Sequence, residues 1–287
     1  MHDRTILITG ATDGLGRVLA HRLAEQDVAL VLHCRDAAKG RALLTALRDR
    51  TGNDRLALVR ADFSSLDEIR ALADRLAELD RLDVLVNNAG IGVETAPRRS
   101  ADGLELAFQV DYLAPYMLSC LLTPLLVRTA AAHSTTARIV NVTSAGQAPL
   151  DFDDVMLERH WDGVQAYCQA KLAQIMLTFD HAELLRGQDV TVNALHPASY
   201  MPTKIVTPLF TVQSTLDEGA ANTARLVTDP ALADTTGVYF NRARPARAHQ
   251  QAYDPTARAR LLEISERLTG VRLSAADGRA VGGVVGE

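Results

Sequence analysis

The sequence predicts an α/β fold, in which a doubly wound parallel sheet of about seven strands carries helices on both faces. Two observations predict it. Short β-branched or aliphatic runs alternate along the 287 residues with longer segments of helical periodicity, which is the rhythm of βαβ units. A glycine-rich turn also follows the first run directly and opens a helix, as at the first strand-to-helix junction of such sheets.

Seven strands are expected at the short apolar runs 5–9, 28–33, 56–60, 84–87, 138–143, 190–195 and 238–240. Helices are expected near residues 15–26, 37–50, 65–79, 102–129, 163–186, 217–228 and 256–269. The helix near 163–186 places Leu172, Ile175, Met176 and Phe179 at the i, i+3, i+4, i+7 spacing of a buried stripe. Its remaining faces are therefore free to carry polar side chains toward a cleft.

Length and composition indicate one large domain, residues 1–270, with a well-buried core. The chain is 47% hydrophobic and carries a net charge of -5, which gives no sign of a nucleic-acid partner. No internal repeat and no Pro- or Ser-rich linker divides it. The Gly- and Ala-rich residues 271–287 show little periodicity and are expected to form a flexible tail.

The sequence further suggests a cytoplasmic protein without a membrane span. Its longest apolar run, residues 121–132, is broken by Pro124 and Arg128 and is shorter than the ~20 residues that cross a bilayer. The first residues have no signal-peptide pattern. Three widely spaced cysteines lack the pairing of zinc ligands, which predicts no metal site and suits a reducing compartment.

Tyr167 and Lys171 form the most informative pair in the chain. Lys171 is one of three lysines among 30 basic residues, so a lysine here suggests a task that arginine cannot perform. Residues four apart lie on one face of a helix, so the ammonium could lower the phenol's pKa from its ordinary value of about 10. An exposed polar pair on a helix surface is the alternative interpretation.

The turn from Thr9 to Gly16 has the composition of a phosphate-binding turn. It reads Thr9-Gly10-Ala11-Thr12-Asp13-Gly14-Leu15-Gly16 and opens a helix. Glycines let the backbone approach a pyrophosphate closely, and the helix N-terminus supplies free N–H groups and a positive dipole end. A plain tight turn stays an alternative on this motif alone.

Four motifs together resemble the short-chain dehydrogenase/reductase family. They are the glycine turn, Asn87-Asn88-Ala89-Gly90 after the fourth strand, Ser144 after the fifth, and Tyr167-x-x-x-Lys171, in the family's order over nearly all of residues 4–245. The glycine spacing is similar to the single-domain branch. The 23 residues from Ser144 to Tyr167 are similar to its retinol-dehydrogenase-like members. The resemblance implies a Rossmann-type sheet that binds NAD(P).

The resemblance also implies hydride transfer between a nicotinamide and a carbonyl or alcohol carbon. Tyr167 would act as general acid/base, and Lys171 would lower its pKa and hold the nicotinamide ribose. Ser144 would bind the substrate oxygen, although a serine in Thr143-Ser144-Ala145-Gly146 could also be a turn residue. The cofactor-binding residues implied are Gly10, Thr12, Asp13, Gly14, Leu15, Gly16, Arg35, Asp62, Phe63, Asn88, Ala89, Gly90, Tyr167, Lys171, Pro197 and Thr203.

The end of the second strand favours NADP(H) over NAD(H). The sequence His33-Cys34-Arg35-Asp36 places a small neutral residue where NAD-preferring relatives tend to have an acid, followed by an arginine suited to a 2′-phosphate. Asp36 keeps NAD as an alternative. Asp62 and Phe63 match the family's adenine-contacting position, although Asp62 could instead cap the next helix.

Two positions depart from the family's pattern. Asp111, in Phe108-Gln109-Val110-Asp111, occupies the place of a catalytic asparagine, and Pro197-Ala198 replaces the usual Pro-Gly. Aspartate keeps the backbone carbonyl and nearly the same shape as asparagine. Its charge could also pair with Lys171 and weaken the effect of the lysine on Tyr167.

The expected substrate is a hydrophobic ketone, aldehyde or secondary alcohol, because an apolar lid is predicted near residues 198–215. The lid holds Tyr200, Met201, Pro202, Leu209 and Phe210 and one charge, Lys204, although these side chains could simply pack the lid on the domain. A non-catalytic NAD(P)-binding sensor or scaffold is the alternative function, and a methyltransferase fits the motifs poorly. A homodimer through the helices near 102–129 and 163–186 is the default expectation, unless the C-terminal segment covers them.

Overall fold

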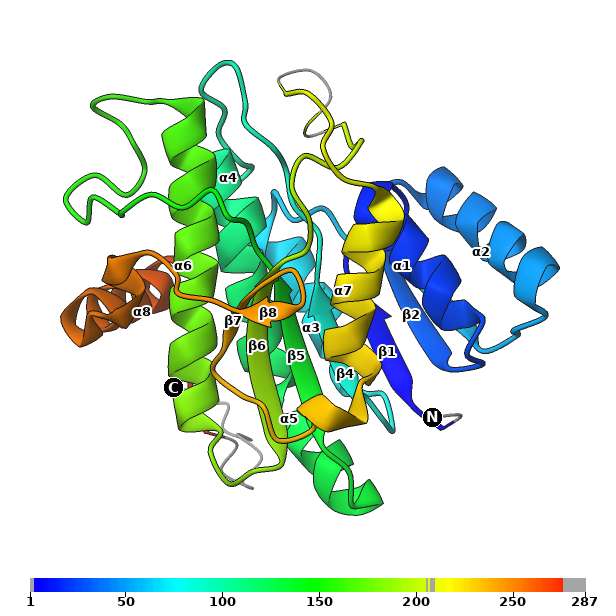
Figure 1. Ribbon diagram of the computed structural model, residues 1–287. Helices are drawn as coiled ribbons and strands as arrows, with labels where there is room; N and C mark the ends of the chain where they lie inside the picture. Colours follow the sequence, from blue (N-terminus) through cyan, green and yellow to red (C-terminus); the bar gives the residue numbers. More distant parts are fainter. Residues whose placement is uncertain (1–2, 205, 207–209, 276–287) are drawn as a thin grey trace, which may run out of the picture.

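The computed structural model describes residues 3–204, 206 and 210–275. At its centre lies one eight-stranded sheet in the order β3-β2-β1-β4-β5-β6-β7-β8 (Figure 1). The strands are β1 (Thr5–Ile8), β2 (Ala29–Cys34), β3 (Leu56–Arg60), β4 (Val84–Asn87), β5 (Ala137–Val142), β6 (Val190–His196), β7 (Tyr239–Asn241) and β8 (Arg244–Pro245). The strand order reverses at β1, which pairs with both β2 and β4.

The Rossmann-type parallel sheet predicted from the sequence is confirmed, and each of the seven expected strands is present within two residues of its predicted ends. The eighth strand, β8, is antiparallel to β7 and has two residues, Arg244 and Pro245. So short a strand leaves no alternating pattern in a sequence, which is why it was not predicted.

Helices cover both faces of the sheet because successive side chains of each strand point to opposite sides. Ile6 and Ile8 of β1 pack with α1 (Gly14–Ala24), α2 (Ala37–Thr51) and α7 (Leu216–Thr228), whereas Leu7 joins the cluster on the other face. That second cluster contains α3 (Leu66–Ala77), α5 (Ala114–His133), α6 (Gly163–Leu184) and α8 (Pro255–Thr269). In Figure 1, α1 and α7 lie over one face, and α3 and α5 lie behind the strands.

The helix expected at 102–129 begins later and is interrupted. It consists of α4 (Leu106–Phe108), a π-helical turn η1 (Gln109–Leu113) and α5, which continues to His133. Pro115 has no N–H and therefore cannot make the α-helical hydrogen bond to the carbonyl of Asp111. Ala114 donates its N–H to the carbonyl of Gln109, five residues back. The irregular turn therefore lies at Asp111.

The C-terminal segment packs on η1, α5 and α6. It contains the short helices η2 (Pro230–Leu232) and η3 (Gln250–Tyr253) and then α8, which contacts α6. The fully buried Tyr112 places its hydroxyl 2.6 Å from the Ser265 hydroxyl of α8, and Tyr116 donates to the carbonyl of Val271 at 2.7 Å. Val271 is buried, so ordered structure extends into the predicted tail, whose residues 276–287 lie outside the described residues.

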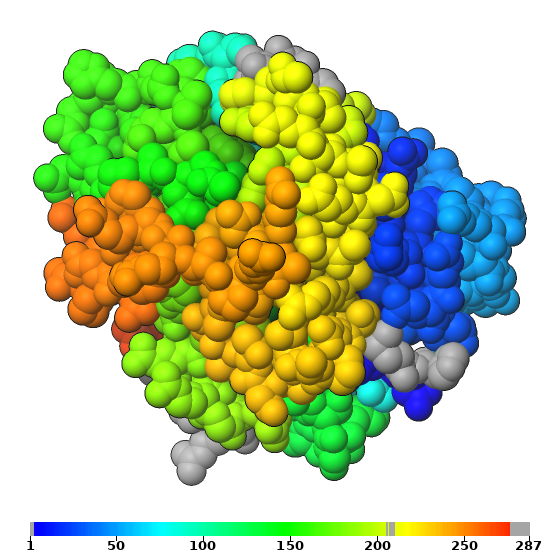
Figure 2. Space-filling view, viewed as in Figure 1, coloured from blue at the N-terminus to red at the C-terminus, as the bar shows by residue number. Residues whose placement is uncertain are grey.

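The long segment between β5 and α6 rests on the C-terminal segment. Leu150 and Gln251 exchange two hydrogen bonds, of 2.8 and 3.1 Å, and Arg260 of α8 donates to Asp153 at 2.5 Å. Figure 2 shows this contact on the surface, where the orange C-terminal segment lies against the green segment that precedes α6. One side of the region near Ser144 is therefore supported by the C-terminus of the chain.

The contact between Tyr112 and Ser265 gives a stability prediction. Ser265 donates its only hydroxyl proton to the carbonyl of Leu261 at 2.7 Å, so Tyr112 donates to Ser265. Ser265→Ala leaves the buried Tyr112 hydroxyl without an acceptor and should lower the free energy of unfolding by about 1–3 kcal/mol. Tyr112→Phe should cost less, because Ser265 keeps its bond to Leu261. Urea denaturation of both single variants and the double variant measures these costs.

Thr256→Ala, at an exposed position on the same helix, is the control and should change the free energy of unfolding by less than about 0.5 kcal/mol. Costs that simply add in the double variant would show that the two hydroxyls do not interact.

Candidate active site

The predicted site residues converge at the carboxyl ends of β1, β4, β5 and β6. The glycine turn follows β1, Asn88–Gly90 follows β4, Ser144 follows β5, and Pro197 follows β6. Tyr167 and Lys171 lie on α6, beside the same sheet edge. The strand order reverses between β1 and β4, which is where open α/β sheets form a ligand crevice.

Glycine is required in the turn because backbones approach one another closely there. Gly10 has φ +66°, and a Cβ on it would lie 2.8 Å from the Cα of Ala89. A Cβ on Gly16 would lie 2.3 Å from the carbonyl oxygen of Gly10. Asp13 accepts the N–H of Gly14 at 2.9 Å and caps α1. The turn is therefore a tightly packed backbone segment at a helix N-terminus, the kind of site that binds phosphate groups, and Gly10 and Gly16 leave no space for a side chain.

Thr9 and Asn88 join the glycine turn to the end of β4. The Thr9 hydroxyl accepts the N–H groups of Asn88 and Ala89, both at 2.9 Å. The Asn88 side chain donates to the carbonyls of Thr9 and Gly10 at 2.8 and 3.2 Å. Asn88 thus shapes the turn through its backbone. Thr9 was not among the predicted site residues, although a threonine immediately before the first glycine was a usable signal.

The end of β2 presents the positive charge of Arg35, and the carboxylate of the neighbouring Asp36 accepts hydrogen bonds from the next helix. Oδ1 of Asp36 accepts the N–H groups of Ala38 and Lys39 at 2.8 and 3.2 Å, and so caps α2. Arg35 is exposed, and Arg60 donates to the Arg35 carbonyl at 3.2 Å. These contacts draw the Asp36 carboxylate toward the first turn of α2.

Asp62 and Phe63 lie after β3, where the sequence placed them. Oδ1 of Asp62 accepts the N–H of Ser64 at 3.0 Å. The N-cap of α3 is Ser65, whose hydroxyl accepts the N–H of Glu68 at 3.3 Å. The alternative that Asp62 itself caps α3 is therefore wrong, because the N-cap lies three residues later and the helix begins at Leu66. Phe63 is buried.

Lys171 and Asp111 form a buried ion pair. Nζ of Lys171 lies 3.4 Å from Oδ2 of Asp111, and the two side chains are 7% and 0% exposed. The N–H of Ile91 donates to Oδ1 of Asp111 at 2.7 Å. A Cβ on Gly90 would lie 3.1 Å from that Oδ1 and 3.3 Å from Nζ, so the glycine admits both groups. Burial raises the pKa of the Asp111 carboxyl, while Lys171 and the Ile91 N–H oppose the rise.

Tyr167 is half-buried and lies beside this pair, with Nζ of Lys171 5.7 Å from its ring centroid. Burial raises the pKa of its phenol above the ordinary value; a hydrogen bond with Ser144 acts against the rise, and the charge of Asp111 adds to it. The expected lowering of this pKa by Lys171 is not found in this structure, where burial of the phenol is the largest effect and the lysine pairs with Asp111. The phenol is therefore protonated at neutral pH.

Ser144 is held on several sides. Its hydroxyl accepts the N–H of Gly146 at 3.0 Å, and its carbonyl accepts from the Tyr239 hydroxyl and the Gln147 side chain, both at 3.1 Å. A Cβ on Gly146 would lie 3.4 Å from the Ser144 hydroxyl oxygen and 3.9 Å from Cε1 of Tyr167. Tyr239 comes from β7, about 95 residues away in the sequence, so local patterns could not identify it.

The predicted lid begins over the glycine turn. Pro197 accepts a hydrogen bond from the Asn222 side chain at 2.8 Å. A Cβ on Gly14 would lie 3.2 Å from Cγ2 of Thr203. Lys204 forms an ion pair with Asp13. Thr203 and Lys204 of the predicted lid therefore contact the glycine turn. Residues 205 and 207–209, which include Leu209, lie outside the described residues.

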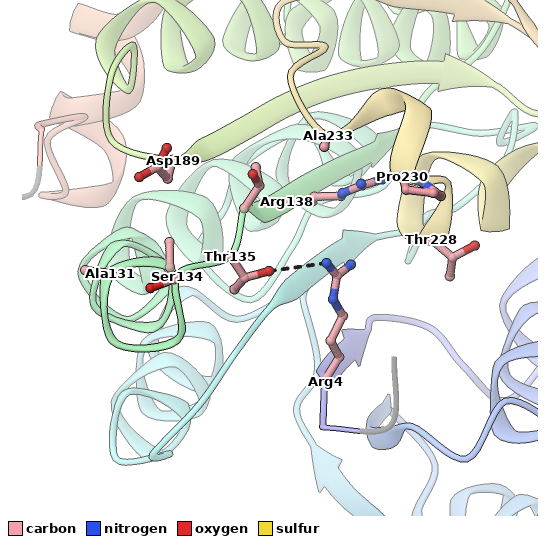
Figure 3. Close-up of a pocket in the computed structure, with 11 residues that line it drawn as sticks. Arg4, Ala131, Ser134, Thr135, Arg138, Asp189, Thr228, Pro230 and Ala233 are labelled. Atoms are coloured by element: carbon pink, nitrogen blue, oxygen red, sulfur yellow. Dashed lines mark hydrogen bonds between the residues drawn. The ribbon is translucent and has the colours of Figure 1, made fainter.

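Cavities of about 640 and 250 Å³ lie away from these residues. The larger is at the opposite end of the sheet, where Figure 3 shows Arg4 bonded to Thr135. The guanidinium of Arg138, which also lines it, donates to the carbonyls of Leu226 and Asp229, both at 2.9 Å. Within the described part of the chain, no group of three or more His, Cys, Asp or Glu residues could hold a metal ion.

One helical stretch within the described residues, Leu106–His133, is long and apolar enough to cross a membrane. Of its most apolar window, 83% is buried inside the fold, as in a core helix. Length and composition alone therefore make it weak evidence for a span, and the expected absence of a membrane span is weakly supported.

Comparison with known proteins identifies the relatives of this chain. A family model described as "short chain dehydrogenase" matches residues 4–213. Human retinol dehydrogenase 14 is 33% identical over 94% of this chain and 88% of its own length, and human retinol dehydrogenase 13 is 32% identical over 93% and 85%.

Solved structures show the same relationship. A short-chain dehydrogenase from Sphingobium yanoikuyae in complex with NADPH has a TM-score of 0.63 and 28% identity, over 77% of this chain and 83% of that one. The Pseudomonas aeruginosa RhlG/NADP active-site complex has a TM-score of 0.66 and 26% identity, over 83% and 94%.

The cytoplasmic location expected from the sequence is contradicted, because the relatives matched over nearly the whole chain are retinol dehydrogenases and one helical stretch of this chain, Leu106–His133, is long and apolar enough to cross a membrane. The expectation rested on the missing signal peptide and on interrupted apolar runs, and neither excludes association with a membrane surface. A family model that spans residues 4–213, and relatives matched over nearly the whole chain, lead to one conclusion: this protein is an oxidoreductase of the short-chain dehydrogenase family.

Proposed function

We propose that this enzyme transfers a hydride between NADP(H) and a hydrophobic ketone, aldehyde or secondary alcohol, with Tyr167 as general acid/base. The observation that carries the proposal is the juxtaposition of Ser144, Tyr167 and Lys171 beside the glycine turn. The crowded glycines Gly10 and Gly16 fit a pyrophosphate that lies against the turn.

Each side chain then has a defined task. The cofactor supplies or accepts the hydride at its nicotinamide ring. In reduction, Tyr167 gives its phenolic proton to the carbonyl oxygen while the carbonyl carbon gains the hydride. Ser144 donates a hydrogen bond to that oxygen as negative charge develops on it. Lys171 holds the ribose and supplies a positive charge near the phenol.

The electrostatics favour the reductive direction. A general acid must carry its proton at the working pH, and the pKa of Tyr167 is raised by burial and by Asp111. Alcohol oxidation needs the phenolate, which the same two effects disfavour. We therefore propose carbonyl reduction as the faster direction near neutral pH.

NADP(H) is the proposed cofactor. Arg35 is exposed at the end of β2, where its guanidinium could bind a 2′-phosphate. Oδ1 of Asp36 accepts two N–H groups of α2, which holds this carboxylate at the helix N-terminus. The related structures bound to NADPH and NADP support this choice. NAD stays the alternative, since a 3-ketoacyl reductase of Brucella melitensis, 25% identical, was solved with NADH.

A hydrophobic substrate is proposed from the lid and from the relatives. Tyr200 and Phe210 of the lid are 39% and 41% exposed, and their ring centroids lie 5.0 Å apart. Exposed aromatic side chains on a segment that contacts the glycine turn fit an apolar carbonyl compound better than a sugar phosphate. The related proteins are named retinol dehydrogenases, and retinol is an apolar alcohol.

The homodimer expected through α5 and α6 has less support. Helix α8 and η3 pack on α6, and Tyr112 and Tyr116 bond to the C-terminal segment. The chain's own C-terminus thus covers part of the surface that such a dimer would need. We propose that these helices do not mediate pairing.

A non-catalytic NADP(H)-binding sensor is the second candidate. One observation favours it: Asp111 neutralises Lys171, which leaves the phenol without its activating cation. Tight NADPH binding without turnover on a broad panel of apolar carbonyl compounds would favour this candidate over the enzyme.

Tyr167→Phe should lower kcat for carbonyl reduction by at least about a thousandfold, because the proton donor is lost while the ring remains. NADPH affinity, measured by the fluorescence of the bound nicotinamide, should stay within about threefold of wild type. Tyr253→Phe is the control, since this tyrosine is 41% exposed and bonds only a local backbone N–H. Retained turnover in Tyr167→Phe would exclude the proposed role.

Asp111→Asn should shift the pH dependence of alcohol oxidation. Deprotonated Tyr167 is the active form in oxidation, and the negative charge of Asp111 raises the pKa of Tyr167. Removing that charge should lower the pH at which the oxidation rate rises by about one unit. The measurement is kcat with NADP⁺ between pH 6 and 11. Asn can still accept the N–H of Ile91.

Asp180→Asn provides the matched control for that shift, because Asp180 lies on the same helix as Tyr167 but pairs with Arg258 at 3.3 Å. Its pH profile in the alkaline range should match wild type. An unchanged or upward shift in Asp111→Asn would contradict the electrostatic coupling.

Arg35→Ser should raise the Kd for NADPH by roughly ten- to a hundredfold, since a charge-assisted hydrogen bond contributes about 1.5–3 kcal/mol. The Kd for NADH should not change. Isothermal titration of both cofactors measures the difference. Arg48→Ser, at an exposed position further along α2, controls for general charge effects. Equal losses for NADH and NADPH would remove Arg35 from the 2′-phosphate site.

A further inference from the structure

His33 lies at the glycine turn and bonds two of its residues, Gly10 and Ala11. The side chain is 3% exposed at the end of β2. Its Nδ1 accepts the N–H of Gly10 at 3.1 Å, and its carbonyl accepts the N–H of Ala11 at 2.9 Å. One residue therefore binds two consecutive backbone donors of the turn and fixes the direction in which the turn leaves β1.

The other side of the imidazole contacts the segment after β3. Nε2 lies 3.0 Å from the carbonyl of Ala61, and the ring stacks on Phe63 with centroids 4.2 Å apart and planes 7° from parallel. Asp62, between these two residues, belongs to the predicted adenine-contacting pair. His33 thus bridges the turn proposed for the pyrophosphate and the segment proposed for the adenine.

The two contacts define the tautomer of the ring. Gly10 can only donate, so Nδ1 carries no proton, and Nε2 must carry the proton that it donates to Ala61. Burial lowers the pKa of His33 to about 4, although the Ala61 carbonyl and the charge of Asp62 oppose the shift. A protonated Nδ1 would face the N–H of Gly10. The bridge therefore needs a neutral imidazole.

We propose that His33 is a cofactor-positioning residue, which sets the spacing between the glycine turn and the Asp62–Phe63 segment and thereby the affinity for NADP(H). The inference rests on the proposed NADP(H) site. No contact of His33 with the cofactor is needed, because the imidazole acts through the backbone of Gly10 and Ala61.

Two amide substitutions separate the two contacts of the ring. Asparagine places an oxygen near the position of Nδ1 and can accept the N–H of Gly10, whereas glutamine places its amide near Nε2 and can donate to Ala61. Alanine removes both contacts. His181 offers a matched control, since it is a fully buried histidine on α6 whose Nε2 lies 2.8 Å from the Thr123 hydroxyl.

NADPH is titrated by fluorescence into wild type, His33→Ala, His33→Asn, His33→Gln and His181→Asn, with the Tm of each recorded. His33→Gln, which loses the bond to Gly10, should raise the Kd about tenfold, and His33→Ala, which loses both contacts, should raise it at least as much; His33→Asn, which keeps the bond to the glycine turn, should recover much of the affinity. His181→Asn should lower Tm without changing the Kd. A purely structural His33 would lower Tm and leave the Kd at the wild-type value.

One result would overturn the positioning role of His33 alone, and a different result would overturn the proposed function as well. If wild type binds NADPH and all folded His33 variants bind it within twofold, the positioning role is overturned while the proposed function stands. If wild type binds neither NADPH nor NADH, the proposed function fails and this inference fails with it. Should His33→Ala not fold, the contrast between His33→Asn and His33→Gln decides the same question.

Discussion

The close approach of the backbone after β1 to the backbone after β4 is the constraint on which the rest of the site depends. A Cβ on Gly10 would meet the Cα of Ala89 at 2.8 Å, and the Thr9 hydroxyl holds two N–H groups of the facing segment. The same contact joins the ends of β1 and β4, where the strand order of the sheet reverses. It also places Gly90 against the ion pair of Asp111 and Lys171. The glycine turn and the pair formed by Asp111 and Lys171 are thereby linked through the segment that follows β4.

Much of this arrangement could be predicted from the sequence, because the motifs follow strand ends and parallel strands align those ends on one sheet edge. The seven parallel strands and the places of Ser144, Tyr167 and Lys171 follow from local patterns. Tyr239 and His33 could not be found in this way, since their importance comes from contacts with residues distant in sequence. The π-helical turn at Asp111 was missed, although Pro115 four residues later was a usable signal.

The structure differs from the sequence-based expectation in the direction of the Tyr167 pKa shift: a lowered pKa was expected, and the pKa is raised. Helical spacing correctly places Lys171 near the phenol, but spacing does not show which anion the lysine faces. In the folded chain a carboxylate oxygen of Asp111 lies 3.4 Å from Nζ, and burial of the phenol raises its pKa. In a buried site, the balance between desolvation and charge depends on every partner within a few ångströms.

Asp111 offers both a backbone carbonyl and a negatively charged side chain, whereas the asparagine usual in the family offers the carbonyl without the charge. Pro115 removes the α-helical donor of its carbonyl, and Tyr112 anchors the same turn to α8. The backbone role of the position is therefore kept, while the side chain adds a negative charge beside Lys171. In the proposed mechanism, a negative charge there stabilises the protonated phenol that carbonyl reduction needs, and it opposes the phenolate that alcohol oxidation needs. The substitution would therefore be compatible with the proposed reduction and would slow the reverse reaction.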